Sequence, residues 1–360
     1  MYFGAYIGWI STSFSLHSRG KKQKMKILFL SHQWTRNSHL SLYSGFKRFI
    51  HFAALGNDAT LVTFGPKEEE YEEDNVSVIA VKGGGKDYFF SNRMAISRKG
   101  SEIAGQFDVI HSIVSDCTYH LPKNKFTFTL HVLPGVVRYK EFRQNAFLFL
   151  KYHLIQKRAF RRARNIVCVS SNLLEGIPKK YRSKARFIPH GVDTEFWDPA
   201  LAKMPKAFPE GGYVLSVGSH GMDRQLLGQL IEANPSVPFV FVGVKEKLGA
   251  HPNAHYLSKI SDEELRDLYL GAALTSRPLL FATANNCILE SLAMGKTILV
   301  NRIPGVTDYL TDETCVFTDT LKDMSLANIP ALKLDPAFIR RTAIEKFSWS
   351  SVVNAYEAIY

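Results

Sequence analysis

The sequence predicts an α/β protein with two tandem doubly wound, Rossmann-like domains that face a cleft. Three observations predict this fold class. A chain of 360 residues is too long for one ordinary core and suits two. Short apolar runs alternate with helical patterns, which indicates parallel sheets covered on both faces. The pattern stops at a stretch rich in proline and glycine and then starts again.

The composition is that of an ordinary globular protein. Hydrophobic residues make up 46% of the chain and charged residues 22%, which excludes collagen-like and disordered classes. The cysteines are far apart, show no CxxC spacing and lie in or beside apolar runs. We therefore expect buried, reduced thiols in a cytoplasmic protein at Cys117, Cys168, Cys287 and Cys315.

Residues 1–24 are predicted to be an extension outside the fold, either disordered or not native. The apolar stretch Met1–Leu16 is too short to span a bilayer, and its basic residues follow it, which is the wrong side for a secretory signal. A weak interfacial anchor is the alternative. Because Met25 opens directly into an apolar run, the first domain is expected to begin there.

The first domain is predicted over residues 25–197, on the acceptor side of the cleft. A helix at Gly45–Leu55 follows from the helical spacing of Phe46, Phe49 and Ile50. Short apolar runs predict strands at Ile27–Leu30, Ala59–Phe64, Val76–Val81, Val109–Val114, Phe126–Leu130, Ile166–Val169 and Arg186–Ile188.

A linker at residues 198–212 separates this domain from a second one at 213–345. The second domain is predicted to have strands at Tyr213–Val217, Phe239–Val242, His255–Leu257, Leu274–Leu280 and Thr297–Val300. Its helices are predicted at Gln225–Ala233, Asp262–Leu270 and Asn286–Ala293. Ser261 supplies an N-cap before an acidic first turn. A C-terminal helix at 346–360 could cross back to the first domain.

Tandem doubly wound domains bind ligands at the carboxyl ends of their strands, so functional residues are expected in the loops that follow strands. Residues Asn285 to Val300 form a loop, a short helix, a glycine stop and an apolar strand. Unpaired N–H groups at the helix start, near Asn285 and Asn286, suit a diphosphate. Glu290, one turn later, could accept two hydrogen bonds from a ribose diol. A solvated helix glutamate is the equal alternative.

This segment resembles the nucleotide-sugar signature of the retaining glycosyltransferases with the GT-B fold, particularly family 4. Residues 303–310, with their proline–glycine turn, are similar to the part of the signature that follows the next strand. Other blocks that resemble the family in order and spacing are Val214–Ser219, Ile260–Tyr269, Val169–Asn172 and Ile188–Phe196. The resemblance covers about residues 25–359.

The resemblance implies transfer of a hexosyl group from a UDP- or GDP-sugar to a saccharide or lipid-linked acceptor, with retention, in cell-surface or exopolysaccharide synthesis. No carboxylate is placed to be a nucleophile, which favours a front-face mechanism. No metal or other cofactor is expected, and the sequence has no Asp-x-Asp motif. A sugar-nucleotide epimerase and a non-catalytic nucleotide-sugar-binding protein are the alternatives.

The second alternative depends on one departure from the family pattern. The signature usually has two glutamates eight positions apart, and the second matches Glu290. Ala282 stands where the first is expected, and that acid normally helps to hold the donor sugar. Either Asn285 or backbone groups replace it, or the donor preference differs, or the activity is lost.

The remaining candidates come from loops that follow strands. For the positive charge that a diphosphate leaving group needs, Arg224 after the Gly218 loop is the first choice and Lys245 the second, although neither has the family's usual spacing. His131 resembles the family's strand-end histidine that faces the donor sugar. Further predicted contacts are Ser44 and Gly45 with the donor phosphates or acceptor, and His32 with the acceptor. Surface bases and structural loop histidines are the alternative readings of these residues.

The net charge of +12 and the pI near 9.4 indicate attraction to phosphate-bearing partners. In Arg138–Arg164 basic residues flank an apolar helical stripe, which suits an anionic membrane surface on the cytoplasmic side. Packing of the stripe on the first domain is the equal alternative. A nucleic-acid partner is not expected, because no aromatic–basic motif or zinc site accompanies the charge.

Overall fold

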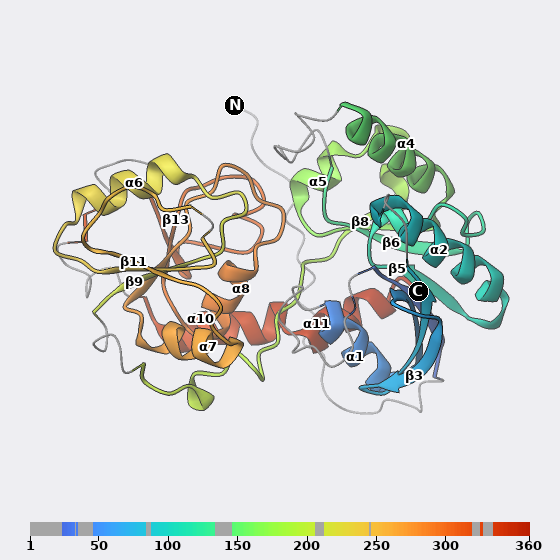
Figure 1. The fold of residues 1–360 in the computed structure, drawn as a ribbon, viewed down its shortest axis with the longest axis horizontal. Coiled ribbons are helices and arrows are strands. Elements are labelled where there is room, and N and C mark those ends of the chain that lie inside the picture. The colour runs from blue at the N-terminus through green and yellow to red at the C-terminus, as the bar shows by residue number, and fades with distance from the viewer. Residues whose placement is uncertain are drawn as a thin grey trace, which may run out of the picture.

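The computed structural model describes residues 24–32, 34, 46–83, 88–133, 146–205, 212–244, 246–318, 325–326 and 334–360. These residues form two lobes, each with its own sheet, joined by the segment that follows β8 and by the C-terminal helix (Figure 1). We call them the first and the second lobe. The predicted α/β class with two mainly parallel sheets is confirmed.

The first lobe has a sheet with the strand order β3-β4-β2-β1-β5-β6-β7-β8, in which all described pairs except β3–β4 are parallel. Its strands are β1 (Lys26–Leu30), β2 (Asp58–Gly65), β3 (Glu69–Glu73), β4 (Val76–Lys82), β5 (Val109–Ser112), β6 (Phe126–Leu130), β7 (Asn165–Cys168) and β8 (Ala185–Phe187). Its helices are α1 (Phe46–Gly56), α2 (Tyr88–Ile103), α4 (Ala146–Arg162) and α5 (Ser171–Gly176), with short 3-10 turns at η1 (Ala104–Gln106), η2 (Ser115–Cys117) and η3 (Lys179–Lys184).

Successive side chains of β1 point to opposite faces of this sheet, and both faces are packed. Ile27 and Phe29 pack with α1 and the C-terminal helix, whereas Leu28 and Leu30 pack with residues of α2 and α4. All four side chains are fully buried. Period-two alternation inside a continuous apolar run is what a parallel strand covered on both faces requires.

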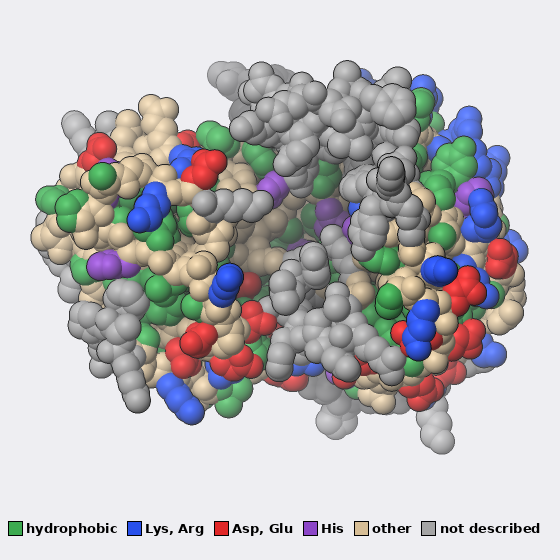
Figure 2. Space-filling model, in the orientation of Figure 1, with side chains coloured by type: hydrophobic (Ala, Val, Ile, Leu, Met, Phe, Trp, Pro, Cys, Tyr) green, Lys and Arg blue, Asp and Glu red, His purple; other side chains and the backbone are tan. Residues whose placement is uncertain are grey.

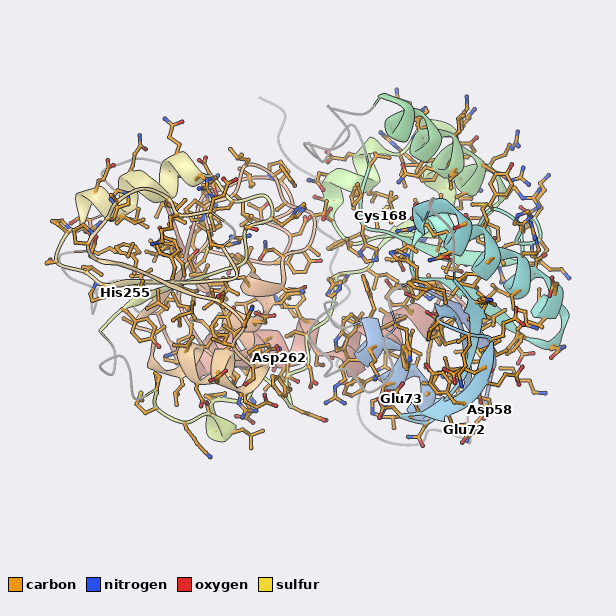
Figure 3. All side chains as sticks on the ribbon, in the orientation of Figure 1. Asp58, Glu72, Glu73, Cys168, His255 and Asp262 are labelled. Carbon is orange, nitrogen blue, oxygen red and sulfur yellow. The ribbon has the colours of Figure 1, made fainter. Side chains whose placement is uncertain are left out.

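Strand β3 was not predicted, because its sequence Glu-Glu-Tyr-Glu-Glu has no apolar run. It pairs antiparallel with β4 at the sheet edge, where acidic side chains discourage pairing with another chain (Figure 3). Glu73 is held there by the Lys47 ammonium at 2.5 Å and by the Trp34 indole N–H at 3.1 Å.

The second lobe has a parallel sheet with the strand order β11-β10-β9-β12-β13-β14. Its strands are β9 (Val214–Val217), β10 (Phe239–Val242), β11 (Ala254–Leu257), β12 (Leu274–Ser276), β13 (Ile298–Val300) and β14 (Cys315–Phe317). Its helices are α6 (Arg224–Ala233), α7 (Asp262–Gly271), α8 (Asn286–Ala293) and α10 (Pro336–Thr342), and a 3-10 turn η4 (Pro199–Leu201) precedes it. Ser261 and Glu264 form a capping box at α7, which confirms the predicted start of this helix.

One predicted strand of the second lobe is too long. The apolar pattern predicted Leu274–Leu280, but β12 ends at Ser276. Pro278 has no N–H for the ladder, and the chain turns to pair Leu279 with Met222 in an antiparallel bridge. Leu280 N–H then donates to the Gly221 carbonyl at 2.8 Å, so the end of the apolar run forms a loop–loop contact.

The C-terminal helix α11 (Trp349–Glu357) follows a π-helical turn, η6 (Ala343–Phe347), and packs on the first lobe (Figure 1). Trp349, Val352, Val353 and Tyr356 are buried in the core that also contains Phe29 of β1. Backbone hydrogen bonds on both sides of Val192 join it to Phe347 and Trp349, at 2.7 and 3.2 Å.

The two lobes also touch through the segment that contains the proline–glycine turn. The Tyr309 hydroxyl donates to the Val169 carbonyl at 2.6 Å and accepts from the His190 N–H at 2.9 Å. The Asp308 carboxylate accepts from the Ser171 N–H at 2.7 Å. A single hydroxyl in Tyr309 therefore satisfies two buried backbone groups of the first lobe.

Replacing Tyr309 by Phe should lower the free energy of unfolding by about 1–3 kcal/mol, because a buried N–H and a buried carbonyl lose their partner. Urea unfolding followed by tryptophan fluorescence measures the change. Tyr119→Phe is the matched control, since the Tyr119 side chain is 37% exposed. Equal stability of the two variants would contradict the bridging role of the hydroxyl.

His111 is a buried, neutral group in the first lobe. Its Nδ1 lies 2.5 Å from the Tyr360 hydroxyl and its Nε2 lies 2.8 Å from the Thr129 hydroxyl. Burial lowers its pKa to about 3. An unfolded histidine titrates near 6.5, so this stabilisation is fully present above pH 6.5 and is lost as the pH falls towards 3.

Acidification from pH 7 to pH 5 should therefore destabilise the wild type more steeply than His111→Asn. The slope contributed by one such histidine is about 1.4 kcal/mol per pH unit. Urea unfolding of both proteins at several pH values measures it, and the comparison cancels the other titrating groups. Parallel curves would show that His111 carries no proton linkage.

Candidate active site

Glu290 is the fifth residue of α8, and a residue of α7 holds its carboxylate in place. The Tyr269 hydroxyl of α7 donates to Glu290 Oε2 at 2.8 Å. Burial raises the pKa of Glu290 to about 7, against the lowering effects of the Tyr269 hydrogen bond and of Arg277. Near neutral pH this carboxyl therefore takes up or releases a proton readily, which is common at functional sites.

Arg277, directly after β12, was missed by the sequence search. Its side chain is among the largest fully buried ones, and the residue is 2% exposed. Nη1 donates to the Gly218 carbonyl at 2.8 Å and Nη2 donates to the His220 carbonyl at 2.7 Å. Its charge interacts with Tyr269, Cys287 and Glu290. We call Tyr269, Arg277, Cys287 and Glu290 the Glu290 cluster.

The glycine loop after β9 is fixed against the loop after β12. Gly218 has a φ of +76°, which favours glycine, and its N–H donates to the Val242 carbonyl at 2.8 Å. Asp223 N–H donates to the Pro278 carbonyl at 3.0 Å. With the two bonds from Arg277, these contacts place Gly218 at the carboxyl ends of β9 and β12, where doubly wound sheets bind ligands.

The helix start that was predicted to receive phosphate is capped. Asn285 is the N-cap of α8, and its side-chain oxygen accepts from the Ile288 N–H at 3.3 Å. Asn286 is the first helical residue and is half-buried. Both residues lie one turn before Glu290, so the structure groups these three candidates on one helix.

The two predicted phosphate-binding bases are placed differently. Arg224 begins α6, and its guanidinium donates to the carbonyls of Glu246 and Lys247 at 3.2 and 2.9 Å. It thus braces the 246–247 loop, whereas Arg277 braces the glycine loop. Lys245 lies outside the described residues.

Ala282, in place of the expected acid, is buried and belongs to the second-lobe core. Its carbonyl accepts from the Asn172 side-chain amide of the first lobe at 2.9 Å. A Cβ on Gly305 would lie 2.3 Å from the same carbonyl, which is why the proline–glycine turn needs glycine there. The backbone of Ala282 is thus enclosed by both lobes, and its short side chain suits that packing.

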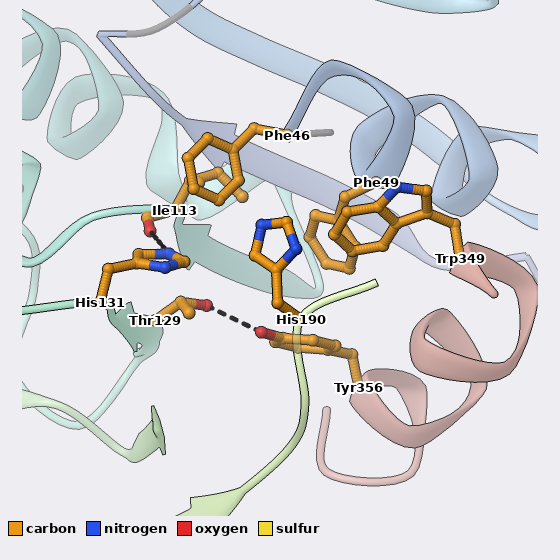
Figure 4. A pocket seen from close by; sticks show the side chains of 8 residues that line it. All are labelled: Phe46, Phe49, Ile113, Thr129, His131, His190, Trp349 and Tyr356. Carbon is orange, nitrogen blue, oxygen red and sulfur yellow. Dashed lines mark hydrogen bonds between the residues drawn. The ribbon is translucent and has the colours of Figure 1, made fainter. Parts of the chain in front are cut away.

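His131, at the end of β6, lines a small apolar cavity with His190, Phe46 and Trp349 (Figure 4). Its Nε2 donates to the Ile113 carbonyl at 3.1 Å, which leaves Nδ1 as an acceptor. Burial, and next the charge of His190, lower its pKa to about 3. Neutral His131 could therefore accept a hydrogen bond from a sugar hydroxyl but would not donate a proton at neutral pH.

His32 follows β1 and belongs to a polar cluster of the first lobe. Arg93 pairs with the Asp116 carboxylate and donates from Nη2 to His32 Nε2 at 3.0 Å. Burial lowers the pKa of His32 to about 4. Ser44 and Gly45, expected near the same strand ends, lie outside the described residues.

His32, Asp116 and Cys117 are the described residues whose donor atoms could hold a metal ion, since these atoms lie within 4.8 Å of one another. The Arg93 guanidinium argues against a cation there. It occupies His32 Nε2 and one Asp116 oxygen, and burial raises the pKa of the Cys117 thiol well above its usual value. These residues therefore fit a polar cluster better than a metal site.

The described part of the basic helix α4 packs its apolar stripe on the first lobe. Ile155 and Phe160 are buried, whereas Leu154 is 55% exposed. Lys157 and Arg161 point to solvent, and Figure 2 shows basic side chains on the outer side of this lobe. Residues 134–145 of the predicted basic segment lie outside the described residues. Among the described helices, none is long and apolar enough to cross a bilayer.

The cysteines, the histidines between the lobes and the N-terminal extension remain to be described. All four cysteines are buried and free, which confirms the expected thiols. Figure 2 shows histidine side chains in the hollow between the two lobes, where a ligand between strand ends would lie. The residues of the proposed extension before Lys24 lie outside the described part of the chain.

Comparisons with known proteins agree with this architecture. Residues 50–196 match the family Glycosyltransferase Family 4. An MMP α-(1→4)-mannosyltransferase from Mycolicibacterium hassiacum is 24% identical over 295 residues, which are 71% of each chain.

Two solved structures show the same fold over nearly the whole chain. Sucrose-phosphate synthase from Thermosynechococcus elongatus aligns with a TM-score of 0.72 at 14% identity, covering 94% of this chain and 98% of that one. HepE from Anabaena, solved in complex with UDP and glucose, aligns with a TM-score of 0.66 at 14% identity, covering 93% and 98%. Together with the sequence matches, they identify the chain as a GT-B glycosyltransferase that resembles family 4.

Proposed function

We propose that this glycosyltransferase moves a hexosyl group from a UDP- or GDP-sugar to a saccharide or lipid-linked acceptor, with retention of configuration. The observation that carries the proposal is the position of Glu290 on α8, where it interacts electrostatically with Arg277, the residue that holds the glycine loop. HepE, a structural neighbour, was solved with UDP-glucose, and the curated relative is a mannosyltransferase. The first protein is consistent with a nucleotide-sugar donor, and the second is consistent with transfer of a hexose.

In this proposal Glu290 binds the nucleotide ribose. Its Oε2 is occupied by Tyr269, and within the described residues no hydrogen bond to Oε1 is found. An ionised carboxylate with one free oxygen can accept from a ribose hydroxyl, and such charge-assisted bonds are worth about 1.5–3 kcal/mol. The start of α8 at Asn285 and Asn286 and the glycine loop at Gly218 would then lie near the diphosphate.

The proposed chemistry is a front-face displacement. The bond between the anomeric carbon and the phosphate oxygen breaks, the acceptor oxygen bonds to that carbon from the same face, and its proton passes to the departing phosphate. Neutral His131 would orient a donor-sugar hydroxyl, and His32 would face the acceptor. The protein would contribute positioning and electrostatic stabilisation, without a metal ion.

The same proposal extends to where the enzyme works. Exposed bases of α4 and of the residues just after it, including Lys157, Arg161 and Arg164, would attract an anionic membrane surface at about 1 kcal/mol each. A lipid-linked acceptor at the inner face of the membrane, in cell-surface or exopolysaccharide synthesis, would be served by such a contact.

Incubation with a panel of UDP- and GDP-sugars should release free UDP or GDP, detected by a coupled assay. Glu290→Ala should weaken binding of the matching nucleotide at least tenfold, because the ribose loses a charged acceptor. Isothermal titration calorimetry measures the affinity.

Glu232→Ala is the matched control, because Glu232 is an exposed glutamate of helix α6. It should bind nucleotide like the wild type. Neither turnover nor nucleotide binding by the wild type would overturn the proposed function. Unchanged affinity in Glu290→Ala would remove Glu290 from the site.

Nucleotide affinity should also decrease as the pH is lowered below about 7. The pKa of Glu290 in the empty site is about 7, and the protonated carboxyl is a poor hydrogen-bond acceptor. Glu290→Gln should lose this component of the pH dependence. The phosphates of the nucleotide titrate equally in both experiments, so the difference between the two profiles isolates Glu290. Identical profiles would exclude the linkage.

A further inference from the structure

The guanidinium of Arg277 is a buried charge that pairs with none of the described carboxylates. Within the described residues no carboxylate lies within salt-bridge distance of it. Its Nε is buried and has no hydrogen-bond partner. Burying a charge with this little compensation costs free energy, so its retention calls for a local reason.

This guanidinium holds the glycine loop. Its two terminal nitrogens hold the carbonyls of Gly218 and His220, and the residue stands at the carboxyl end of β12, between β9 and β13. Nη2 also lies 3.8 Å from where a Cβ on Gly218 would be. Arg277 is therefore packed directly beneath the turn of the glycine loop.

Three groups act electrostatically on this charge, the Cys287 thiol, the Tyr269 hydroxyl and the Glu290 carboxyl, and Glu290 is the carboxyl among them. Arg277 and Glu290 interact electrostatically, although they are too far apart for a salt bridge. The other groups that act on Glu290 are the Tyr269 hydroxyl, Asp262 at the start of α7 and the Cys287 thiol on its own helix. Arg277 is the positively charged member of this set.

We propose that Arg277 is the positioning residue of the donor site, which fixes the glycine loop and stabilises the negative charge of Glu290 so that the carboxylate can receive a nucleotide. The nucleotide part of this proposal rests on the proposed function, whereas its action on Glu290 does not. Arg277 touches the loop and acts on the ribose through Glu290.

The decisive experiment follows the Glu290 carboxyl in the nucleotide-free protein. Carbon-13 NMR of protein labelled at the glutamate carboxyl is recorded between pH 5 and 9, and Glu290→Gln assigns the signal. Arg277→Gln removes the charge but can still donate a hydrogen bond, and Arg277→Met is a second neutral variant. Arg277→Lys keeps the charge. Arg302→Gln, an exposed arginine after β13, is the matched control.

In the neutral variants the midpoint of Glu290 should rise by about one pH unit or more, because an opposite charge has been removed. In Arg277→Lys and Arg302→Gln it should stay close to the wild-type value. If Arg277 had only a structural role, Arg277→Gln and Arg277→Lys would change the midpoint of protein unfolding, but Glu290 would titrate at the same pH in both variants. Equal midpoints in those two variants, or no shift in any neutral variant that folds, would overturn the proposal.

Calorimetric titration of the same proteins with UDP and with GDP at pH 7 tests the link to the donor. Arg277→Gln should bind the matching nucleotide about tenfold more weakly than the wild type, with partial recovery in Arg277→Lys. Wild-type protein that binds neither nucleotide would contradict the proposed function, while the NMR titration would still decide the role of Arg277. Normal nucleotide affinity in Arg277→Gln would overturn the positioning role.

Discussion

The charge of Arg277 has to be accommodated inside a protein core, and the strand-end loops of the second lobe are arranged around that requirement. Backbone carbonyls from the glycine loop turn towards it, and the loop after β12 bends back to pair with residues 221–223. Carbonyl oxygens are weaker partners than carboxylates, so the site keeps an excess of positive potential. A preorganised potential of this kind suits a ligand that brings its own negative charge.

The two sides of the cleft handle ionisable groups in opposite ways. In the second lobe a cation and a carboxyl are buried apart, so that each still influences the other. In the first lobe Arg93 and Asp116 pair directly, and the buried His111 and His131 stay neutral among aromatic rings. The first lobe thus offers neutral acceptors and shape, and the second offers charge. Such a division fits a nucleotide on one side and uncharged sugar hydroxyls on the other.

Much of the fold followed from local pattern, and the failures have physical causes. Ile27–Leu30 of β1 and all of β10 are apolar, and every residue of β6 is buried although two of them are threonines. A parallel strand that is covered on both faces buries the side chains of both faces. β3 is an acidic edge strand, whose pairing depends on its neighbour and not on its own residues. The overlong prediction at β12 came from two leucines of the following loop, of which Leu279 is buried and Leu280 is exposed. Side chains enter cores from loops as readily as from strands.

The site shows the same limit. Glu290 and Gly218 were predicted because they stand in a recognisable order along the chain, and their roles in binding stay predictions. Arg277 was not predicted, because an arginine after a strand has no sequence signature. Its side chain is positioned by hydrogen bonds to carbonyls that lie 57 and 59 positions away in the sequence. Arg224 is nearer to the glycine loop in sequence but turns to the 246–247 carbonyls. The direction of a side chain depends on tertiary contacts, and these cannot be deduced from composition and spacing.

The helix α11 has a consequence for how the chain is made. The first-lobe core holds residues 27–188 together with side chains that come after residue 348. During synthesis the first lobe would therefore emerge with an uncovered apolar face and would wait, while the whole second lobe is translated, for its final helix. A second lobe that folds promptly would shorten that interval, because it would deliver α11 to the waiting surface already anchored at one end.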